Sequence, residues 1–180
     1  AVLNNGGGFY SAEHYIHEAK MCGAIIELPC INHSDHANKV EGKTIYLGFG
    51  YLKNVEQLTM QRILTERQLF GDYISLDNFM DRIPISIEQL SVLIRINAFR
   101  FTKIPKTALL WKATFKLKVT KTKQVQEQVK LFHSQQQNFE IPQLNNHWLE
   151  NVYDEIELLG FTVHDYFSLV TDTFCPHIKA

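Results

Sequence analysis

Two short helical hairpins within residues 52–101 constrain the fold of this chain more than any other feature of its sequence. The second hairpin opens at Ser86, whose hydroxyl can accept a hydrogen bond from the backbone amide three residues later. Apolar residues then recur at helical spacing, and the turn that follows carries Asn97, a residue type that tolerates positive φ. Neither hairpin has enough apolar surface to fold alone, so the sequence predicts that the two pack on each other.

Further short helices and one β-hairpin are expected around this pair. In chain order the expected elements are a helix capped by Ser11 and ended by Gly23, a buried extended stretch over 24–28, a β-hairpin over 39–45 with Gly42 at its turn, and helices over about 56–68, from Ser75 to before Pro84, over about 107–117 and from His147 to Gly160. Residues 119–139 are rich in Gln and Lys without a sustained apolar stripe, which favours a mobile linker.

The last of these helices has the clearest amphipathic pattern in the C-terminal part of the sequence. Its predicted buried face consists of Leu149, Val152, Tyr153, Ile156 and Leu159. The fold class that follows is mainly α: a tandem helix-hairpin-helix, a small β-hairpin and an additional C-terminal helix.

Positive charge is concentrated directly after the second hairpin. From Arg95 to Lys130 the sequence has ten Lys or Arg and one acid, although the formal net charge of the chain is −1. From Leu131 onward it has one base and seven acids. A block this basic is either a nucleic-acid face or a solvated helix and linker, and its position beside the hairpin favours the first interpretation.

Several enzyme classes leave no signature in this sequence. It has no Gly-x-Ser-x-Gly elbow, no Walker loop, no His-Glu-x-x-His and no closely spaced acidic pair on a strand for two magnesium ions. Gly6, Gly7 and Gly8 precede a helix as in phosphate-cradling loops, but no Gly-Lys-Ser/Thr follows them. The sequence is therefore typical of a binding module rather than a complete enzyme.

Cysteine content and hydropathy indicate the compartment. Three scattered cysteines are too few for a disulfide framework, which points to a reducing, cytoplasmic environment. No apolar run approaches the roughly 20 residues that cross a membrane, so no membrane partner is expected. The first residues form neither a signal peptide nor a transit sequence and include no initiator Met, so we expect an excised piece of a longer protein.

A metal site is the sharpest alternative in the N-terminal part. Cys30, His33, Asp35 and His36 lie within seven residues, and all four side chains are potential metal ligands. Structural zinc sites draw their ligands from two separated pairs, and the distant candidates are only Cys175 and His177. A loop whose polar side chains form local turns is favoured, and no metal is predicted.

Two stretches have the pattern of recognition sites. In helix-hairpin-helix units the turn points backbone N–H groups at a phosphate, and neighbouring Lys and Arg add charge. Such contacts carry no base information, so binding would be sequence-independent and salt-sensitive. Separately, Gln128 followed by adjacent Leu131 and Phe132 in a flexible segment is typical of a short peptide that docks in an apolar groove.

The order of motifs resembles the C-terminal third of the bacterial DNA polymerase III alpha subunit over nearly the whole chain. The motifs that carry the resemblance are Asn4-Asn5-Gly6-Gly7-Gly8-Phe9-Tyr10, His17-Glu18-Ala19, Leu28-Pro29-Cys30-Ile31-Asn32-His33-Ser34, Ile45-Tyr46-Leu47-Gly48-Phe49, Ile63-Leu64-Thr65-Glu66-Arg67, Leu76-Asp77-Asn78-Phe79 with Arg82, Leu93-Ile94-Arg95 with Asn97-Ala98-Phe99, and Glu155-Ile156-Glu157-Leu158-Leu159-Gly160-Phe161.

The resemblance implies three segments. Residues 1–50 would be the end of the fingers region, 51–118 a tandem helix-hairpin-helix that grips duplex DNA, and 119–180 a clamp-binding linker and connector helix. The parent would be a DNA-directed DNA polymerase, a nucleotidyltransferase that uses Mg²⁺. Its catalytic carboxylates would lie outside this fragment, so no cofactor is expected here. Other replisome subunits are implied partners.

The resemblance also assigns residues. Gln128, Leu131 and Phe132 match the family's pattern for binding the sliding clamp. The expected DNA-binding residues are Lys53, Asn54, Arg95, Asn97, Arg100, Lys103 and Lys106. This sequence departs from the family at the turns: Asn54-Val55-Glu56 stands where the first hairpin usually has Gly-Val-Gly, and Asn97 stands where the second favours Gly. Glycine lets backbone approach phosphate closely, so the basic block from Arg95 onward is the better DNA-binding candidate.

The altered turns leave a second hypothesis open. In that interpretation the chain is a divergent protein–protein interaction module, and its hairpins serve only to pack against each other.

Overall fold

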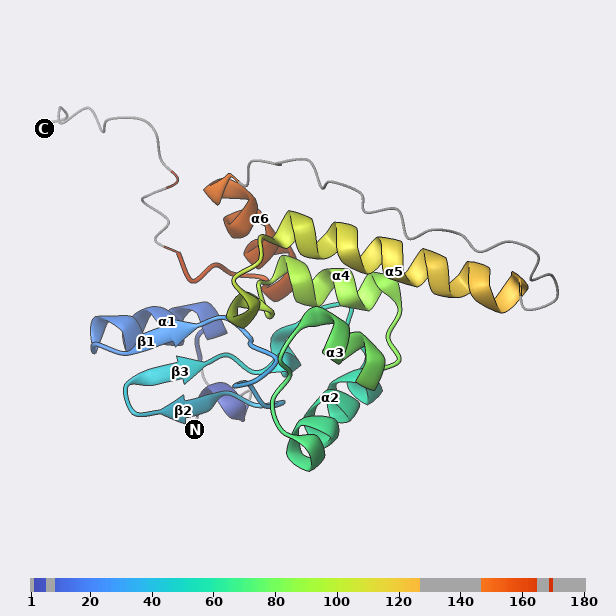
Figure 1. Ribbon diagram of the computed structural model, residues 1–180. Helices are drawn as coiled ribbons and strands as arrows, with labels where there is room; N and C mark the ends of the chain where they lie inside the picture. Colours follow the sequence, from blue (N-terminus) through green and yellow to red (C-terminus); the bar gives the residue numbers. More distant parts are fainter. Residues whose placement is uncertain (1, 6–8, 127–146, 165–168, 170–180) are drawn as a thin grey trace, which may run out of the picture.

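The computed structural model describes residues 2–5, 9–126, 147–164 and 169 (Figure 1). In the helix that ends at residue 126, the side chains are described up to residue 118. The described part is mainly α-helical with one small three-stranded sheet, which confirms the predicted fold class. After the 3-10 turn η1 (Val2–Asn4), helix α1 (Ala12–Met21) starts at Ser11 and ends before Gly23, as expected.

The sheet is larger than predicted. Strands β2 (Lys39–Glu41) and β3 (Thr44–Tyr46) form the expected antiparallel hairpin around Gly42, which has φ +62°. Strand β1 (Ile25–Glu27) adds to β3 in parallel, giving the order β1-β3-β2. The predicted extended stretch is confirmed, but its predicted burial is only partial, because β1 is an edge strand: Ile25 is exposed, while Ile26 and Leu28 pack partly against the core.

The helices follow the predicted boundaries closely, except for the end of α5 (Lys106–Gln126). The helical region comprises η2 (Phe49–Tyr51), α2 (Gln57–Phe70), α3 (Leu76–Arg82), α4 (Ile87–Arg95), η3 (Arg100–Thr102), α5 and α6 (Trp148–Leu159). Ser75 and Ser86 accept hydrogen bonds from the amides of Asn78 and Gln89, so these two predicted N-caps are formed, whereas the Ser11 side chain makes no cap hydrogen bond to α1. Gly71 ends α2 with φ +76°.

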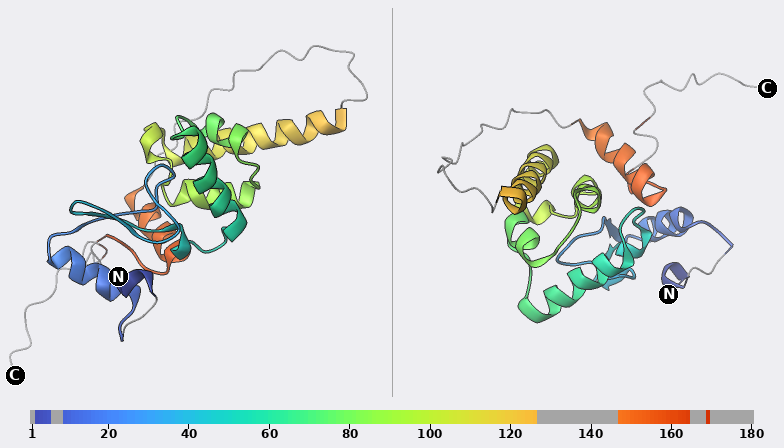
Figure 2. Two further views of the ribbon diagram at one scale, coloured as in Figure 1. Left: turned by 90° about the horizontal axis from the view of Figure 1, so that it is seen from below. Right: turned by 90° about the vertical axis from the view of Figure 1, so that its right-hand side faces the viewer.

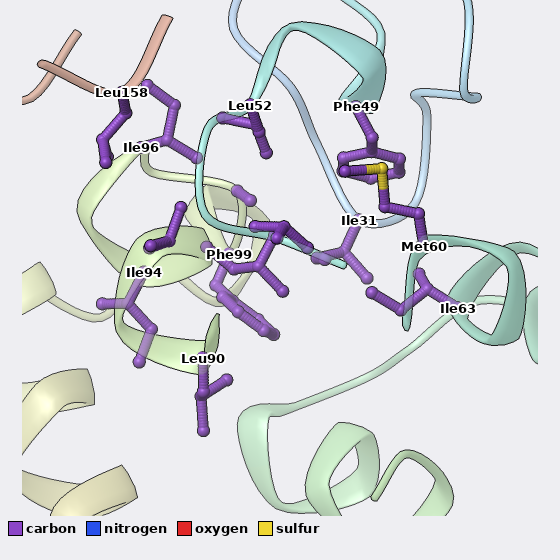
Figure 3. Close-up of a cluster of buried hydrophobic side chains, with 14 of the residues drawn as sticks. Ile31, Phe49, Leu52, Met60, Ile63, Leu90, Ile94, Ile96, Phe99 and Leu158 are labelled. Carbon is purple, nitrogen blue, oxygen red and sulfur yellow. The ribbon is translucent and has the colours of Figure 1, made fainter. Parts of the chain in front are cut away.

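One apolar core joins the two hairpins, as the sequence predicted. Leu52 and Ile63 from the first unit lie in the same cluster as Leu90 and Phe99 from the second (Figure 3). The Phe99 ring meets the Phe79 ring edge-on, with centroids 5.0 Å apart. These side chains are fully or almost fully buried, so the relative position of the hairpins is fixed by close packing.

Helix α5 is longer than expected. It continues through residues 119–126, which the sequence had indicated as the start of a mobile linker, and it extends beyond the other elements (Figures 1 and 2). Four of its eight residues are Lys or Gln, which are good helix formers and continue the helix without an apolar stripe, although the other four are the less favourable Val and Thr. The rest of that predicted linker lies outside the described residues, and the division at 118/119 falls inside α5.

Helix α6 has the predicted span but buries a different face. Val152 and Leu159 are buried as expected, whereas Tyr153 and Ile156 are exposed. The carboxylate of Glu155 is instead buried, where it accepts hydrogen bonds from Thr162 Oγ1 (2.6 Å) and from the backbone N–H of residue 163 (2.9 Å). A buried carboxylate is stable where such donors compensate for lost hydration, and hydrophobic periodicity does not anticipate it.

Polar side chains fix the loop 30–38 to the helices. Asn32 exchanges two hydrogen bonds with the backbone of Tyr73, both 2.9 Å long. Arg67 donates to the carbonyls of Ile31 and Ser34 (2.8 Å each) and to Asp35 Oδ1 (2.6 Å). The loop is therefore held in two ways: its Asn32 side chain bonds the backbone at Tyr73, and Arg67 of α2 bonds the loop's own carbonyls.

Tyr73 gives a test of this arrangement. Its ring is buried and its hydroxyl donates to the Ile63 carbonyl (2.9 Å), and burial raises its pKa to about 12. An alkaline titration followed by tyrosinate absorbance should show one late step near pH 12, which Tyr73→Phe removes. Because the folded pKa is raised, the stability that the protonated phenol provides is present below about pH 10 and is lost as the pH rises towards 12. Complete ionisation of all tyrosines near pH 10 in the folded protein would contradict the buried position.

Candidate nucleic-acid interface

The first hairpin turn lies between η2 and α2. Asn54 has φ +64°, so an asparagine adopts the left-handed conformation at the first residue of the altered Gly-Val-Gly pattern. Val55 is buried in the core, and Lys53 and Asn54 are exposed. The turn thus places its polar side chains outward and anchors itself with one apolar side chain.

The second turn repeats this arrangement. Asn97 has φ +62° and follows the last residue of α4 by two positions. The N–H groups of Asn97 and Ala98 donate to the carbonyls of Ile94 (2.9 Å) and Leu93 (3.0 Å). Both turns therefore use asparagine in a left-handed conformation, which glycine adopts most readily but asparagine tolerates.

Gln89 connects the two hairpins directly. Its backbone N–H donates to Ser86 Oγ (3.4 Å), while its side-chain Oε1 accepts from the backbone N–H of Glu56 (3.1 Å), the residue that caps α2. The sequence had suggested a capping box at Ser86, and the structure forms only the serine half of it. The glutamine links the start of α2 to the start of α4, a role that the sequence pattern did not reveal.

Arg95 and Lys106 flank the second turn and contact carboxylates of α6. Arg95 Nε lies 2.8 Å from Asp154 Oδ1, and its terminal nitrogens contact Glu157. Lys106 Nζ lies 2.6 Å from Asp154 Oδ2 and 2.8 Å from the Arg95 carbonyl oxygen. Hydrogen bonds to Glu157 and Asp154 raise the pKa of Arg95, and the hydrogen bond from Arg95 lowers the pKa of Glu157.

Arg100 faces the opposite part of the chain. Its guanidinium donates to the carbonyls of Pro29 (3.1 Å) and Leu28 (3.0 Å) and lies 3.1 Å from Glu27 Oε2. The side chain thereby connects the second turn to strand β1. Arg100 and Arg95, both predicted DNA-binding residues, contact groups of the protein on different sides of the hairpin.

Lys53 and Lys103 are the exposed lysines at the turns. The Lys53 backbone N–H donates to the Leu158 carbonyl (2.9 Å), so the C-terminal end of α6 reaches the first turn. Lys103 has φ +57° and follows η3 directly. Lys53 thus adjoins the left-handed Asn54 at the first turn, and Lys103 follows the second turn.

The basic block continues along α5, where acids of α3 lie opposite it. Lys112 contacts Asp77, and Lys116 Nζ lies 2.7 Å from Asp81 Oδ1 and 3.5 Å from Asp77 Oδ1. The sequence grouped these lysines with Arg95 as one cationic stretch. The structure pairs Lys112 and Lys116 with α3, Arg95 and Lys106 with α6, and Arg100 with Glu27 of β1, which a residue count along the chain does not predict.

The candidate metal ligands are not brought together. Among the described residues no group of three or more His, Cys, Asp or Glu side chains gathers around one point. Asp35 contacts Arg67, His33 stacks on Tyr46 with ring centroids 4.9 Å apart, and Cys30 is buried. The carbonyl of His36 accepts from the Gly50 N–H (2.9 Å), and Cβ at Gly48 would lie 2.4 Å from the same oxygen. The segment is thus a tightly packed loop.

Other predicted features lie outside the described residues. Gln128, Leu131 and Phe132 belong to these, as do the distant metal candidates Cys175 and His177. In the part of the chain that the structure covers, no helix is both long and apolar enough to cross a lipid bilayer.

The left-handed turns lead to a stability prediction. Asn97→Ala should lower the free energy of unfolding by about 1 kcal/mol. Alanine has a Cβ that is strained at positive φ, and it lacks the short polar side chain with which asparagine compensates by local hydrogen bonds. Asn97→Gly should be tolerated, because glycine has no Cβ. Denaturant unfolding provides the measurement. Asn151→Ala, inside α6, is the matched control and should not destabilise, since alanine is the better helix former. Equal effects at both positions would contradict the role of backbone strain.

Comparisons with known proteins agree with this geometry. Residues 23–109 match the family model described as "Helix-hairpin-helix motif". That range contains both turns and the start of α5.

Curated relatives cover part of the chain. It is 27% identical over 108 residues to the "Error-prone DNA polymerase" of Mycobacterium tuberculosis (strain CDC 1551 / Oshkosh). The aligned residues make up 59% of this chain and 10% of that protein. It is 36% identical over 70 residues to the "DNA polymerase III subunit alpha" of Thermus aquaticus. Here the aligned residues make up 39% of this chain and 6% of that protein. The match thus spans a tenth or less of each relative's length. The chain carries a helix-hairpin-helix motif and is homologous, over part of its length, to DNA polymerase III alpha subunits and error-prone DNA polymerases.

Proposed function

We propose that this chain holds duplex DNA without sequence preference, as a segment of a bacterial DNA polymerase alpha subunit. The observation that carries the proposal is the pair of left-handed turns, at Asn54 and Asn97, within one helix-hairpin-helix core. The partial homology to DNA polymerase III alpha and error-prone polymerases supports the same role.

The physical basis is a phosphate contact at each turn. Each asparagine adopts the positive φ that glycine favours, so the shape of the turn is kept although a Cβ is present, and an exposed lysine in the same segment adds a charge-assisted contact. Lys53 with Asn54, and Lys103 with Asn97, are the residues assigned to these contacts. Arg95, Arg100 and Lys106 form a second set, whose cations must exchange a protein partner for phosphate. None of these contacts reads a base edge, so the binding is non-specific.

Catalysis belongs to the longer parent chain. We assign to the parent the template-directed addition of deoxynucleotides, with Mg²⁺ held by carboxylates outside this segment. This segment would support that DNA synthesis by keeping the duplex in position, which reduces the entropy cost of aligning the primer end.

Contact with a sliding clamp is the second part of the proposal. Gln128, Leu131 and Phe132 have the pattern of a short docking peptide, in which the Leu and Phe side chains act as apolar anchors. Other replisome subunits would then be neighbours rather than direct ligands of the hairpins.

One structural observation favours an alternative, a protein–protein interaction module. Three of the seven predicted DNA-binding side chains, Arg95, Arg100 and Lys106, contact carboxylates or carbonyls of the protein itself. In that case the hairpins would only pack, and DNA would not bind even at low salt.

A salt titration separates the two functions. Lys53→Gln and Lys103→Gln should each weaken binding of a mixed-sequence duplex and reduce the slope of log affinity against log salt by about 1, because each removes one phosphate contact. Fluorescence anisotropy provides the measurement. Lys43→Gln, an exposed lysine at the β2–β3 turn, is the matched control and should leave the slope unchanged. Binding that is insensitive to salt, or absent at low salt, would favour the interaction module.

The clamp contact has its own test. Replacing Leu131 and Phe132 together by Ala should abolish binding to the clamp and leave the affinity for duplex DNA unchanged, since the anchors do not contact DNA. Val129→Ala, in the same segment, is the control and should retain clamp binding. An unchanged clamp affinity in the double variant would remove this part of the proposal.

A further inference from the structure

The acidic edge of α6, which we define as Asp154 and Glu157, lies against the second hairpin. These residues are three positions apart on one helix, so their side chains project to the same side. Together they contact Arg95, the last residue of α4, and Lys106, the first residue of α5. Figure 1 shows α6 beside the adjoining ends of these two helices.

We propose that the acidic edge of α6 competes with DNA phosphate for the cations of the second hairpin. This inference rests on the proposed function, because it requires that the chain bind DNA. Carboxylates present to a guanidinium the same kind of charged, two-oxygen acceptor that a phosphate does. The acidic edge would thus lower the affinity for DNA and limit the number of phosphates that the hairpin contacts.

Three ion pairs join these residues: Asp154 pairs with Lys106 and with Arg95 Nε, and Glu157 pairs with the terminal nitrogens of Arg95. Burial distinguishes the Lys106–Asp154 pair from the Arg95–Glu157 pair. The Lys106 and Asp154 side chains are only 8% and 15% exposed, so this pair is largely shielded from water. The Arg95 and Glu157 side chains are 32% and 61% exposed. An exposed pair is weak and its long side chains reorient readily, whereas breaking a buried pair leaves an uncompensated charge. Arg95 is therefore the cation that exchanges Glu157 for phosphate.

The exchange does not require α6 to leave. Leu158, Leu159 and Phe161 are buried in the core cluster, and Figure 3 shows Leu158 beside Ile96 and Leu52. The Leu158 carbonyl also accepts the Lys53 N–H. These contacts keep the helix in place, so the competition takes place between side chains on a fixed surface.

A purely structural role for the ion pairs makes a different prediction. If Asp154 and Glu157 only attach α6, neutralising them would lower the stability and leave DNA affinity equal or weaker. If they compete with phosphate, neutralising them raises the affinity and steepens its dependence on salt.

Anisotropy titrations of the complete chain with a mixed-sequence duplex decide between these roles. Glu157→Gln should raise the affinity about tenfold near 0.1 M salt and steepen the slope by about 0.9, the effect of one added phosphate contact. Glu150→Gln, an exposed acid in the first turn of the same helix, is the matched control for loss of one negative charge. Thermal unfolding checks that Glu157→Gln remains folded, which its exposed position favours.

A double-mutant cycle shows whether Arg95 carries the gain. Arg95→Gln should weaken DNA binding more in the Glu157→Gln background than in the unmodified chain, because only there are its terminal nitrogens free for phosphate while Nε stays with Asp154. Additive effects, or equal gains from Glu150→Gln and Glu157→Gln, would overturn the inference while leaving the proposed function intact. If neither the unmodified chain nor Glu157→Gln binds the duplex, both fail. If Glu157→Gln binds the duplex and the unmodified chain does not, the acidic edge blocks DNA binding completely, which supports the inference.

Discussion

Close packing of apolar side chains between the two hairpins is the interaction on which the structure depends. Phe99, directly after the second turn, is fully buried and meets Phe79 of α3 edge-on. Removing a buried phenylalanine costs about 3–5 kcal/mol, a large fraction of the stability of an ordinary domain. Both turns are therefore held at a fixed separation by a core that neither hairpin could form alone. The hydrogen bond between Gln89 and Glu56 adds a polar link to that packing.

Short-range features of this fold could be predicted from the sequence. The caps at Ser75 and Ser86 and the helix end at Gly160 depend on residues within one turn, and all three are formed. The left-handed turn at Asn97 follows from the properties of that residue type. The parallel pairing of β1 with β3 and the buried carboxylate of Glu155 could not be predicted in this way. Each depends on partners that only the folded chain brings close.

The candidate interface shows the same division between local and distant information. The sequence located the cations beside the second turn, and the structure places Arg95 and Lys106 there. Their acidic partners come from α6: Asp154 lies 59 positions after Arg95 and 48 after Lys106 in the sequence. The count of charges along the sequence treated the basic block from Arg95 to Lys130 and the acidic part from Leu131 onward as two separate regions. In the folded protein that part supplies the counter-ions, so the local charge at the hairpin is far smaller than the basic block suggests.

The length of α5 has a consequence for whatever follows it. At 1.5 Å per residue its 21 residues span about 30 Å, and its first residue is fixed beside the second turn by Lys106. The helix is thus a stiff arm, and its end at Gln126 lies about 30 Å along the helix axis from the second turn.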